Sequence, residues 1–170
     1  MEGYLLDTCA VSALLDGQHK NHVNMRSALD AIEEGAPRYV SAIAVAEVMF
    51  GALADEASGH SSPRLTAFLK RVQNYPIREI TKHTRSEYAE LRKNLAITYL
   101  PTLLKSDRPR WVDNWVDRVT GEKLQIDEND LWICAQAREW NLTLVTTDEK
   151  MVIRMSKADS SIKFLFVRSL

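Results

Sequence analysis

The stretch Gly3-Tyr4-Leu5-Leu6-Asp7-Thr8-Cys9-Ala10 places a carboxylate directly after a short apolar run. Tyr4 to Leu6 have the pattern of a buried strand, and the apolar run Val11 to Leu15 is typical of a helix. Asp7 is therefore predicted at the carboxyl end of a strand, the edge of an open α/β sheet at which ligands bind. Capping of the helix by Asp7 or Thr8 is the alternative, and for a single aspartate it is the simpler interpretation.

Length and composition indicate a soluble protein that can bury a sizeable core. The 170 residues are 45% hydrophobic and 26% charged, which predicts one domain covering residues 1–170. No apolar run approaches the length that crosses a bilayer, and the first strand leaves no room for a signal peptide, so we expect a cytoplasmic protein with no membrane association. Cys9 and Cys134 lack metal-binding spacing, so they are expected to be reduced thiols.

The charge is uneven along the chain although the net charge is only -1. Lys and Arg against Asp and Glu number 3 and 9 in residues 1–59, 11 and 4 in residues 60–110, and 8 and 10 in residues 111–170. The basic middle could follow a phosphate backbone. On charge alone, a set of solvated helix faces is the slightly better interpretation. The basic residues considered are Arg64, Lys70, Arg71, Arg78, Lys82, Arg85, Arg92 and Lys93.

Short apolar strands alternate with helices along the chain, which favours a parallel sheet between two layers of helices. The helix after Ser41 is expected to pack through one face made of Ile43, Ala46, Phe50 and Leu53. Another short helix is expected to run from Asp148 through Met151. The predicted strands are Tyr4–Leu6, Tyr39–Val40, Ile77–Ile80, Leu142–Val145 and Phe164–Val167.

Residues from about 101 to 124 are predicted to form a helical insertion that begins at Pro101. Trp111 and Trp115 stand four residues apart, the spacing of one helix face. Such a stripe usually packs into a core, although on an insertion it could equally contact a partner protein.

Four acids occupy positions at which the expected elements bring side chains together. Asp7 and Asp148 follow strands, Glu47 lies in an early turn of the helix after the second strand, and Asp130 lies at a helix start. Asp148 could simply cap its helix, and Asp130 could belong to a capping box with Asp127. Glu47 is harder to explain structurally, because an unpaired carboxylate near the core is costly.

Convergence of all four carboxylates would create mutual repulsion that a hard, oxygen-preferring cation, Mg²⁺ or Mn²⁺, would relieve. Such a cation activates water and stabilises charge on a phosphorus under attack. No Ser/His/Asp or Cys/His arrangement and no phosphate-binding glycine loop competes with this interpretation. The histidines are expected at the surface, away from these motifs. They are His19, His22, His60 and His83.

Four acidic motifs together resemble those of PIN-domain ribonucleases, most closely the VapC-type toxins of bacterial toxin-antitoxin systems. Their order and spacing match the family over nearly the whole chain, although each motif alone is short. They are Leu5-Leu6-Asp7-Thr8, Val45-Ala46-Glu47-Val48 with Gly51, Asn129 to Ala137, and Leu144-Val145-Thr146-Thr147-Asp148.

The resemblance implies a PIN-like three-layer α/β/α domain with a central, mainly parallel sheet of four to five short strands. It implies a Mg²⁺- or Mn²⁺-dependent endoribonuclease whose metal-binding and catalytic residues are Asp7, Glu47, Asp130 and Asp148. It further implies an RNA substrate, a cognate antitoxin protein that silences the site, and a homodimer. Two features depart from the family pattern: the long insertion, and Cys9 where Asn or Ser is common.

Two other functions stay open. A non-catalytic PIN-like module would bind RNA or a protein, which the retained acids argue against. A Mg²⁺-dependent phosphatase would also begin with an Asp after the first strand, but it would carry a second Asp two residues later as a general acid. Here that position holds Cys9.

Overall fold

A five-stranded, wholly parallel sheet forms the centre of the computed structural model, which describes residues 2–60 and 63–168, with the backbone alone at 63–65. The strand order is β3-β2-β1-β4-β5, so the N-terminal strand is central. The strands are β1 (Tyr4–Leu6), β2 (Arg38–Ser41), β3 (Ile77–Arg78), β4 (Thr143–Thr146) and β5 (Lys163–Phe166). The predicted parallel sheet is confirmed.

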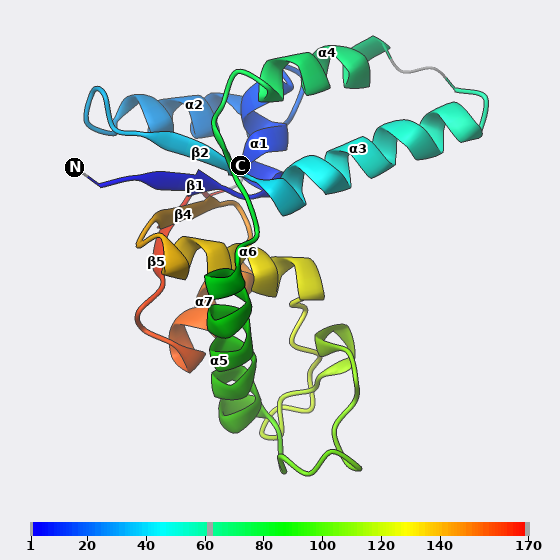
Figure 1. The fold of residues 1–170 in the computed structure, drawn as a ribbon, viewed down its shortest axis with the longest axis vertical. Coiled ribbons are helices and arrows are strands. Elements are labelled where there is room, and N and C mark those ends of the chain that lie inside the picture. The colour runs from blue at the N-terminus through cyan, green and yellow to red at the C-terminus, as the bar shows by residue number, and fades with distance from the viewer. Residues whose placement is uncertain (1, 61–62, 169–170) are drawn as a thin grey trace.

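Helices cover both faces of this sheet, as Figure 1 shows, so the expected three-layer α/β/α architecture is also confirmed. One layer holds α1 and α2, with α3 and α4 beside them, and the other holds α5, α6 and α7. The helices are α1 (Thr8–Leu15), α2 (His22–Asp30), α3 (Ala42–Ala57), α4 (Pro63–Val72), α5 (Lys82–Tyr99), α6 (Glu128–Glu139) and α7 (Glu149–Ala158). None of the helices in the described part of the chain is both long and apolar enough to span a bilayer.

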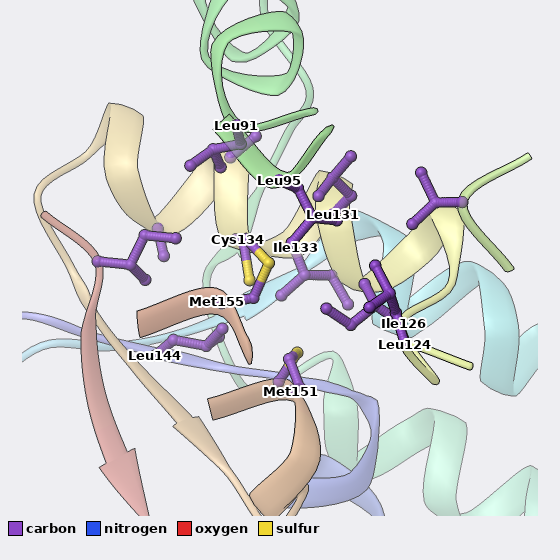
Figure 2. Packing of buried hydrophobic residues seen from close by; sticks show 14 of the residues in the cluster. Leu91, Leu95, Leu124, Ile126, Leu131, Ile133, Cys134, Leu144, Met151 and Met155 are labelled. Atoms are coloured by element: carbon purple, nitrogen blue, oxygen red, sulfur yellow. The ribbon is translucent and has the colours of Figure 1, made fainter. Parts of the chain in front are cut away.

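The first strand is apolar on both sides because both of its faces are buried. Leu5 points into the core beneath α5, α6 and α7, and Leu6 points into the core on the α1 and α2 side, each with no exposed surface. Figure 2 shows part of the first core, where leucines of α5 and α6 meet methionines of α7. Two packed cores therefore fix β1 and the residue that follows it.

Two expected helices differ from the structure. The helix after Asp148 continues to Ala158, because Met151 and Met155 lie one turn apart and are both fully buried. The expected packed face of α3 is wrong except at Ile43, which packs against the core. Ala46 is exposed, and Phe50 and Leu53 are 72% and 61% exposed, because α3 leads away from the sheet (Figure 1).

The expected helical character of residues 101–124 is also wrong. In this segment the structure has a single 3-10 turn, Val112–Asn114, and one isolated antiparallel bridge between Val116 and Lys123. Trp115 has no exposed surface and donates from Nε1 to the Pro109 carbonyl at 2.9 Å, whereas Trp111 is half exposed. The four-residue spacing therefore does not mark one helix face: the backbone is irregular, and the segment folds around one buried indole.

Trp115→Ala is expected to lower the free energy of unfolding by about 3–5 kcal/mol, the usual cost of truncating a buried large aromatic side chain. Chemical denaturation followed by far-UV circular dichroism measures this change. Trp111→Ala is the matched control, because that indole is half exposed, and its effect should be much smaller. Equal losses for the two variants would contradict the assignment of Trp115 as the anchor.

Candidate active site

Asp7 and Asp148 lie beside each other because the strands that precede them pair in register. In the parallel pairing of β1 and β4, Leu6 is opposite Val145. Asp7 follows β1 directly, and Asp148 comes two residues after the end of β4. Both carboxylates therefore arrive at the carboxyl edge of the sheet, where ligands of parallel α/β folds bind.

Asp7 is the most buried of the four acids, with 5% of its surface exposed. Its Oδ1 accepts the backbone N–H of Ala10 at 2.7 Å, so it caps α1. Burial raises the pKa of Asp7 from 3.8 to about 6, and the charge of Asp148 adds to the effect, against the opposing effect of the hydrogen bonds. The desolvated carboxylate therefore resists carrying a negative charge unless a cation compensates it.

The thiol of Cys9 donates toward both oxygens of Asp7, at 3.0 and 3.1 Å, and lies 3.4 Å from the Thr146 hydroxyl. Its sulfur also accepts the backbone N–H of Thr147 at 3.1 Å. Burial, followed by the adjacent Asp7 charge, raises the pKa of Cys9 to about 12. Cys9 therefore remains a neutral thiol that orients Asp7, and both cysteines are free, as expected.

Asp148 and Asp130 both make the helix-capping contacts that were the structural alternative to metal binding. Asp148 Oδ1 accepts the N–H of Met151 at 2.9 Å, which caps α7. Asp130 and Asp127 form a capping box, with Asp127 N–H donating to Asp130 Oδ2 at 3.0 Å and Asp130 N–H donating to Asp127 Oδ1 at 2.8 Å. The same side chains thus cap helices and lie at the carboxyl edge of the sheet.

Asp130 shares its electrostatic environment with the other two aspartates. Burial is the main cause that raises its pKa to about 7; the negative charges of Asp127, Asp148 and Asp7 contribute to the rise, and the backbone hydrogen bond with Asp127 opposes it. Asp7, Asp130 and Asp148 also act together on the buried thiol of Cys134, whose pKa lies well above its usual value, chiefly through burial. Three of the four candidate acids are therefore neighbours.

Glu47 accepts hydrogen bonds from two neutral side chains, one beside Asp7 and one beside Asp130. The hydroxyl of Thr8 donates to Glu47 Oε2, and Asn129 Nδ2 donates to Oε1 at 2.8 Å. Thr8 adjoins Asp7, and Asn129 adjoins Asp130. The half-buried carboxylate is thus satisfied, which removes the cost expected for an unpaired one. Sequence reasoning missed these two donor roles, and their position next to an acid was the only available signal.

The donor set fits a hard divalent cation by its chemistry. All four acids offer oxygen, and burial with mutual repulsion penalises Asp7 and Asp130 as anions. No group of three or more His, Cys, Asp or Glu side chains within the described residues is arranged as a ready-made metal cluster. Mg²⁺ does not need a complete cluster of protein ligands, because it keeps several waters and usually binds one or two carboxylates together with substrate phosphates.

Not every residue of the basic middle segment is free to contact a phosphate backbone. Arg78 lies between the rings of Tyr39 and Trp140, at 3.8 and 4.2 Å, and Arg92 pairs with Glu128 at 3.3 Å. The side chain of Arg64 lies outside the described residues. Two of the predicted phosphate-binding residues, Arg78 and Arg92, are therefore engaged in contacts within the protein.

Arg71 is placed differently from those residues. A hollow of about 720 Å³ between α1, α3 and α4 is lined by Thr8 and Glu47 at one end and reaches Arg71. Arg71 donates to the Leu15 carbonyl at 2.6 Å. The candidate site therefore adjoins a hollow in which Arg71 is the basic side chain among the described lining residues.

The structure is a three-layer parallel α/β/α domain with acids gathered at the carboxyl edge of its sheet. The PIN domain matches residues 4–157, so the chain belongs to the PIN domain family, as its motifs predicted. No match is found among curated proteins.

Solved toxin-antitoxin structures share the fold at low identity. VapBC2 from Rickettsia felis, bound to a promoter DNA fragment, is 16% identical with a TM-score of 0.63, covering 96% of this chain and 97% of that chain. VapBC-1 from nontypeable Haemophilus influenzae is 19% identical with a TM-score of 0.63 and 96% coverage of each chain. VapBC-5 from Mycobacterium tuberculosis is 18% identical with a TM-score of 0.55 and 99% coverage of each chain.

Asp130→Asn is expected to stabilise the metal-free protein at alkaline pH. The pKa of Asp130 rises from 3.8 to about 7 on folding, so its ionised form destabilises the folded state above that range and the penalty disappears as pH falls toward 4. The amide oxygen can still accept the Asp127 N–H. Thermal unfolding in EDTA should show a melting temperature higher by at least about 2–4 °C at pH 8, the effect of 1 kcal/mol in a chain of this size.

The gain should shrink at pH 5, because Asp130 is then largely protonated in the folded protein. Glu34→Gln is the control, since Glu34 is exposed and its replacement should leave the melting temperature nearly unchanged at both pH values. A destabilised Asp130→Asn protein at pH 8 would contradict the electrostatic description of the site.

Proposed function

We propose that this protein is a Mg²⁺- or Mn²⁺-dependent endoribonuclease that hydrolyses RNA phosphodiester bonds in the cytoplasm. Residues 1–170 would act as one domain. The observation that carries the proposal is the grouping of Asp7, Asp130 and Asp148 at one sheet edge, with Glu47 hydrogen-bonded to Thr8 and Asn129, the neighbours of Asp7 and Asp130. Membership of the PIN domain family supports it.

Asp7, Asp130 and Glu47 would hold the metal, and Asp148 would complete the shell or orient the attacking water. When bound, the cation activates water and stabilises negative charge on the phosphorus. The protein fixes its carboxylates beforehand through Ala10 N–H, Met151 N–H and the Asp127 capping box. Such preorganisation avoids reorganising the ligands at the moment of reaction.

We further propose a cognate antitoxin as partner and a homodimer as the working form. VapBC complexes with the same fold support the first. Met49, Phe50 and Leu53 on α3 are 46%, 72% and 61% exposed, and exposed apolar patches of this kind often mark protein interfaces.

The phosphatase alternative receives no support from position 9. Cys9 occupies the place of the expected general acid, and its thiol, with a pKa near 12 and hydrogen bonds to Asp7, is a poor proton donor at neutral pH. A binding module without catalysis has no specific contact in its favour.

Asp7→Asn is expected to reduce RNA cleavage by at least about 100-fold, because it removes a charged metal ligand and with it much of the metal's catalysis. Single-stranded RNA incubated with purified protein and Mg²⁺ or Mn²⁺, resolved on a denaturing gel, measures this loss. EDTA should stop RNA cleavage by the parent protein. Asp30→Asn, an exposed acid on α2, is the matched control and should cleave normally. Full activity of Asp7→Asn would overturn the assignment, and undiminished RNA binding without cleavage in any metal would favour the binding module.

Expression of the parent chain is expected to arrest growth of a bacterial host, because an unchecked ribonuclease depletes its RNA. The Asp7→Asn chain, expressed to the same level, should not arrest growth. A small DNA-binding protein encoded directly upstream should restore growth when it is co-expressed with the parent. Equal arrest by the parent and Asp7→Asn would disconnect toxicity from the acidic site.

A further inference from the structure

Residues 105–110 and Arg92 enclose a second hollow, of about 480 Å³, outside the acidic site. It is lined by Arg92, Lys105, Arg108, Pro109 and Arg110. Four of its five lining residues are basic, and this hollow belongs to the 101–124 segment in which the chain departs from the compact pattern of its family.

Three of these cations have no anionic partner among the described residues. Within that part of the chain, Lys105, Arg108 and Arg110 take part in no ion pair, while Arg92 pairs with Glu128 at 3.3 Å. Asp107 is the one acid in residues 105–110, and its Oδ1 accepts the Ser106 hydroxyl at 2.8 Å. The hollow is therefore positive overall and free to receive an anion.

The wall of the hollow is anchored rather than loose. Arg92 Nη2 donates to the Arg110 carbonyl, and the buried Trp115 donates to the Pro109 carbonyl at 2.9 Å. Glu128 accepts the Val112 N–H at 3.2 Å in addition to its contact with Arg92. These contacts hold Arg92 and the backbone of Pro109 and Arg110 against α5 and α6, so less entropy is lost when this part of the wall binds a ligand.

The same contacts place the hollow beside the start of the helix that carries Asp130. Glu128 is the first residue of α6, and Asp130 is the third. Figure 1 shows the segment rising from the end of α5 to this end of α6, which faces the side on which α3 extends. A chain that passes over the acids could therefore continue onto the basic segment.

We propose that this hollow binds a backbone phosphate of single-stranded RNA next to the bond that is cleaved. The inference rests on the proposed ribonuclease function and specifies how that site holds its substrate. Arginine and lysine are the usual phosphate ligands, and a groove of such residues can follow a single strand without reading its sequence.

Trp111 extends the same site toward the bases. Its indole is 50% exposed, and the guanidinium of Arg110 lies 4.7 Å from the ring centroid. Aromatic side chains beside a basic groove commonly stack against unpaired bases. The exposed indole, which contributes little to the core, thereby has a role as a stacking surface.

The test compares Lys105→Gln/Arg108→Gln with the parent and with Lys20→Gln/Arg26→Gln, which removes two exposed cations from the α2 side. Fluorescence anisotropy with a labelled single-stranded RNA, in EDTA at several NaCl concentrations, gives affinity and its salt dependence. The first variant should bind about 10-fold more weakly, and its slope of log K against log[salt] should fall by about 0.7 for each phosphate that the variant no longer neutralises. The control should match the parent.

Trp111→Ala should also weaken binding about 10-fold but leave the salt slope unchanged, because stacking releases no counterions. In cleavage assays with Mg²⁺, both site variants should raise KM while kcat changes little, because neither contacts the scissile bond. The affinity for duplex RNA should be the same with and without Trp111, because paired bases are not available for stacking on the indole.

The outcomes test the proposed ribonuclease function and the phosphate site separately. A parent protein that neither binds nor cleaves RNA would overturn the proposed function itself. A parent that cleaves RNA, together with a Lys105→Gln/Arg108→Gln protein of unchanged affinity and salt slope, would overturn only the phosphate site. Poly-glutamate serves as a model of an acidic protein. If the Lys105→Gln/Arg108→Gln variant lost binding to poly-glutamate but bound RNA like the parent, the phosphate site would also be overturned and the hollow would be assigned to an acidic protein partner.

Discussion

The pairing of β1 with β4 is the constraint on which the site depends. Leu5 and Leu6 are buried in opposite cores, so a slip of one residue would move each into the wrong layer. With the register fixed, Asp7 cannot shift relative to Asp148. Two carboxylates that would separate in water are therefore held near each other by apolar packing. Burial is the main cause of the raised pKa of Asp7, and the charge of Asp148 adds to it.

Helix capping reduces the cost of this burial. Asp7 and Asp148 cap α1 and α7, and Asp130 lies in the first turn of α6. Each carboxylate therefore faces the positive end of a helix dipole, which stabilises negative charge. Capping and metal binding are thus compatible roles, and a single acid in the sequence could not distinguish between them.

The sequence predicts the layers and the edge of the sheet well, because strand burial and the β-α alternation are local patterns. β1 has the predicted bounds, and the β4 strand leads to Asp148 as expected. The donors to Glu47 could not be predicted, since Thr8 and Asn129 lie 39 and 82 residues away from it. The spacing of Trp111 and Trp115 misled because periodicity reports a helix face only where the backbone is helical.

The charge of the candidate site sets a further requirement on the rest of the molecule. Within the described residues, Asp7, Glu47, Asp130 and Asp148 form no ion pair with a basic side chain. The carboxylates therefore stay available to a cation, but by themselves they repel a polyanion. Positive charge must then come from a bound metal and from residues beyond the acids, since exposed charges act over a Debye length of only about 8 Å at physiological salt. The unpaired cations Lys105, Arg108 and Arg110 lie on a separate segment, so on the proposal above they would supply such charge without neutralising the carboxylates.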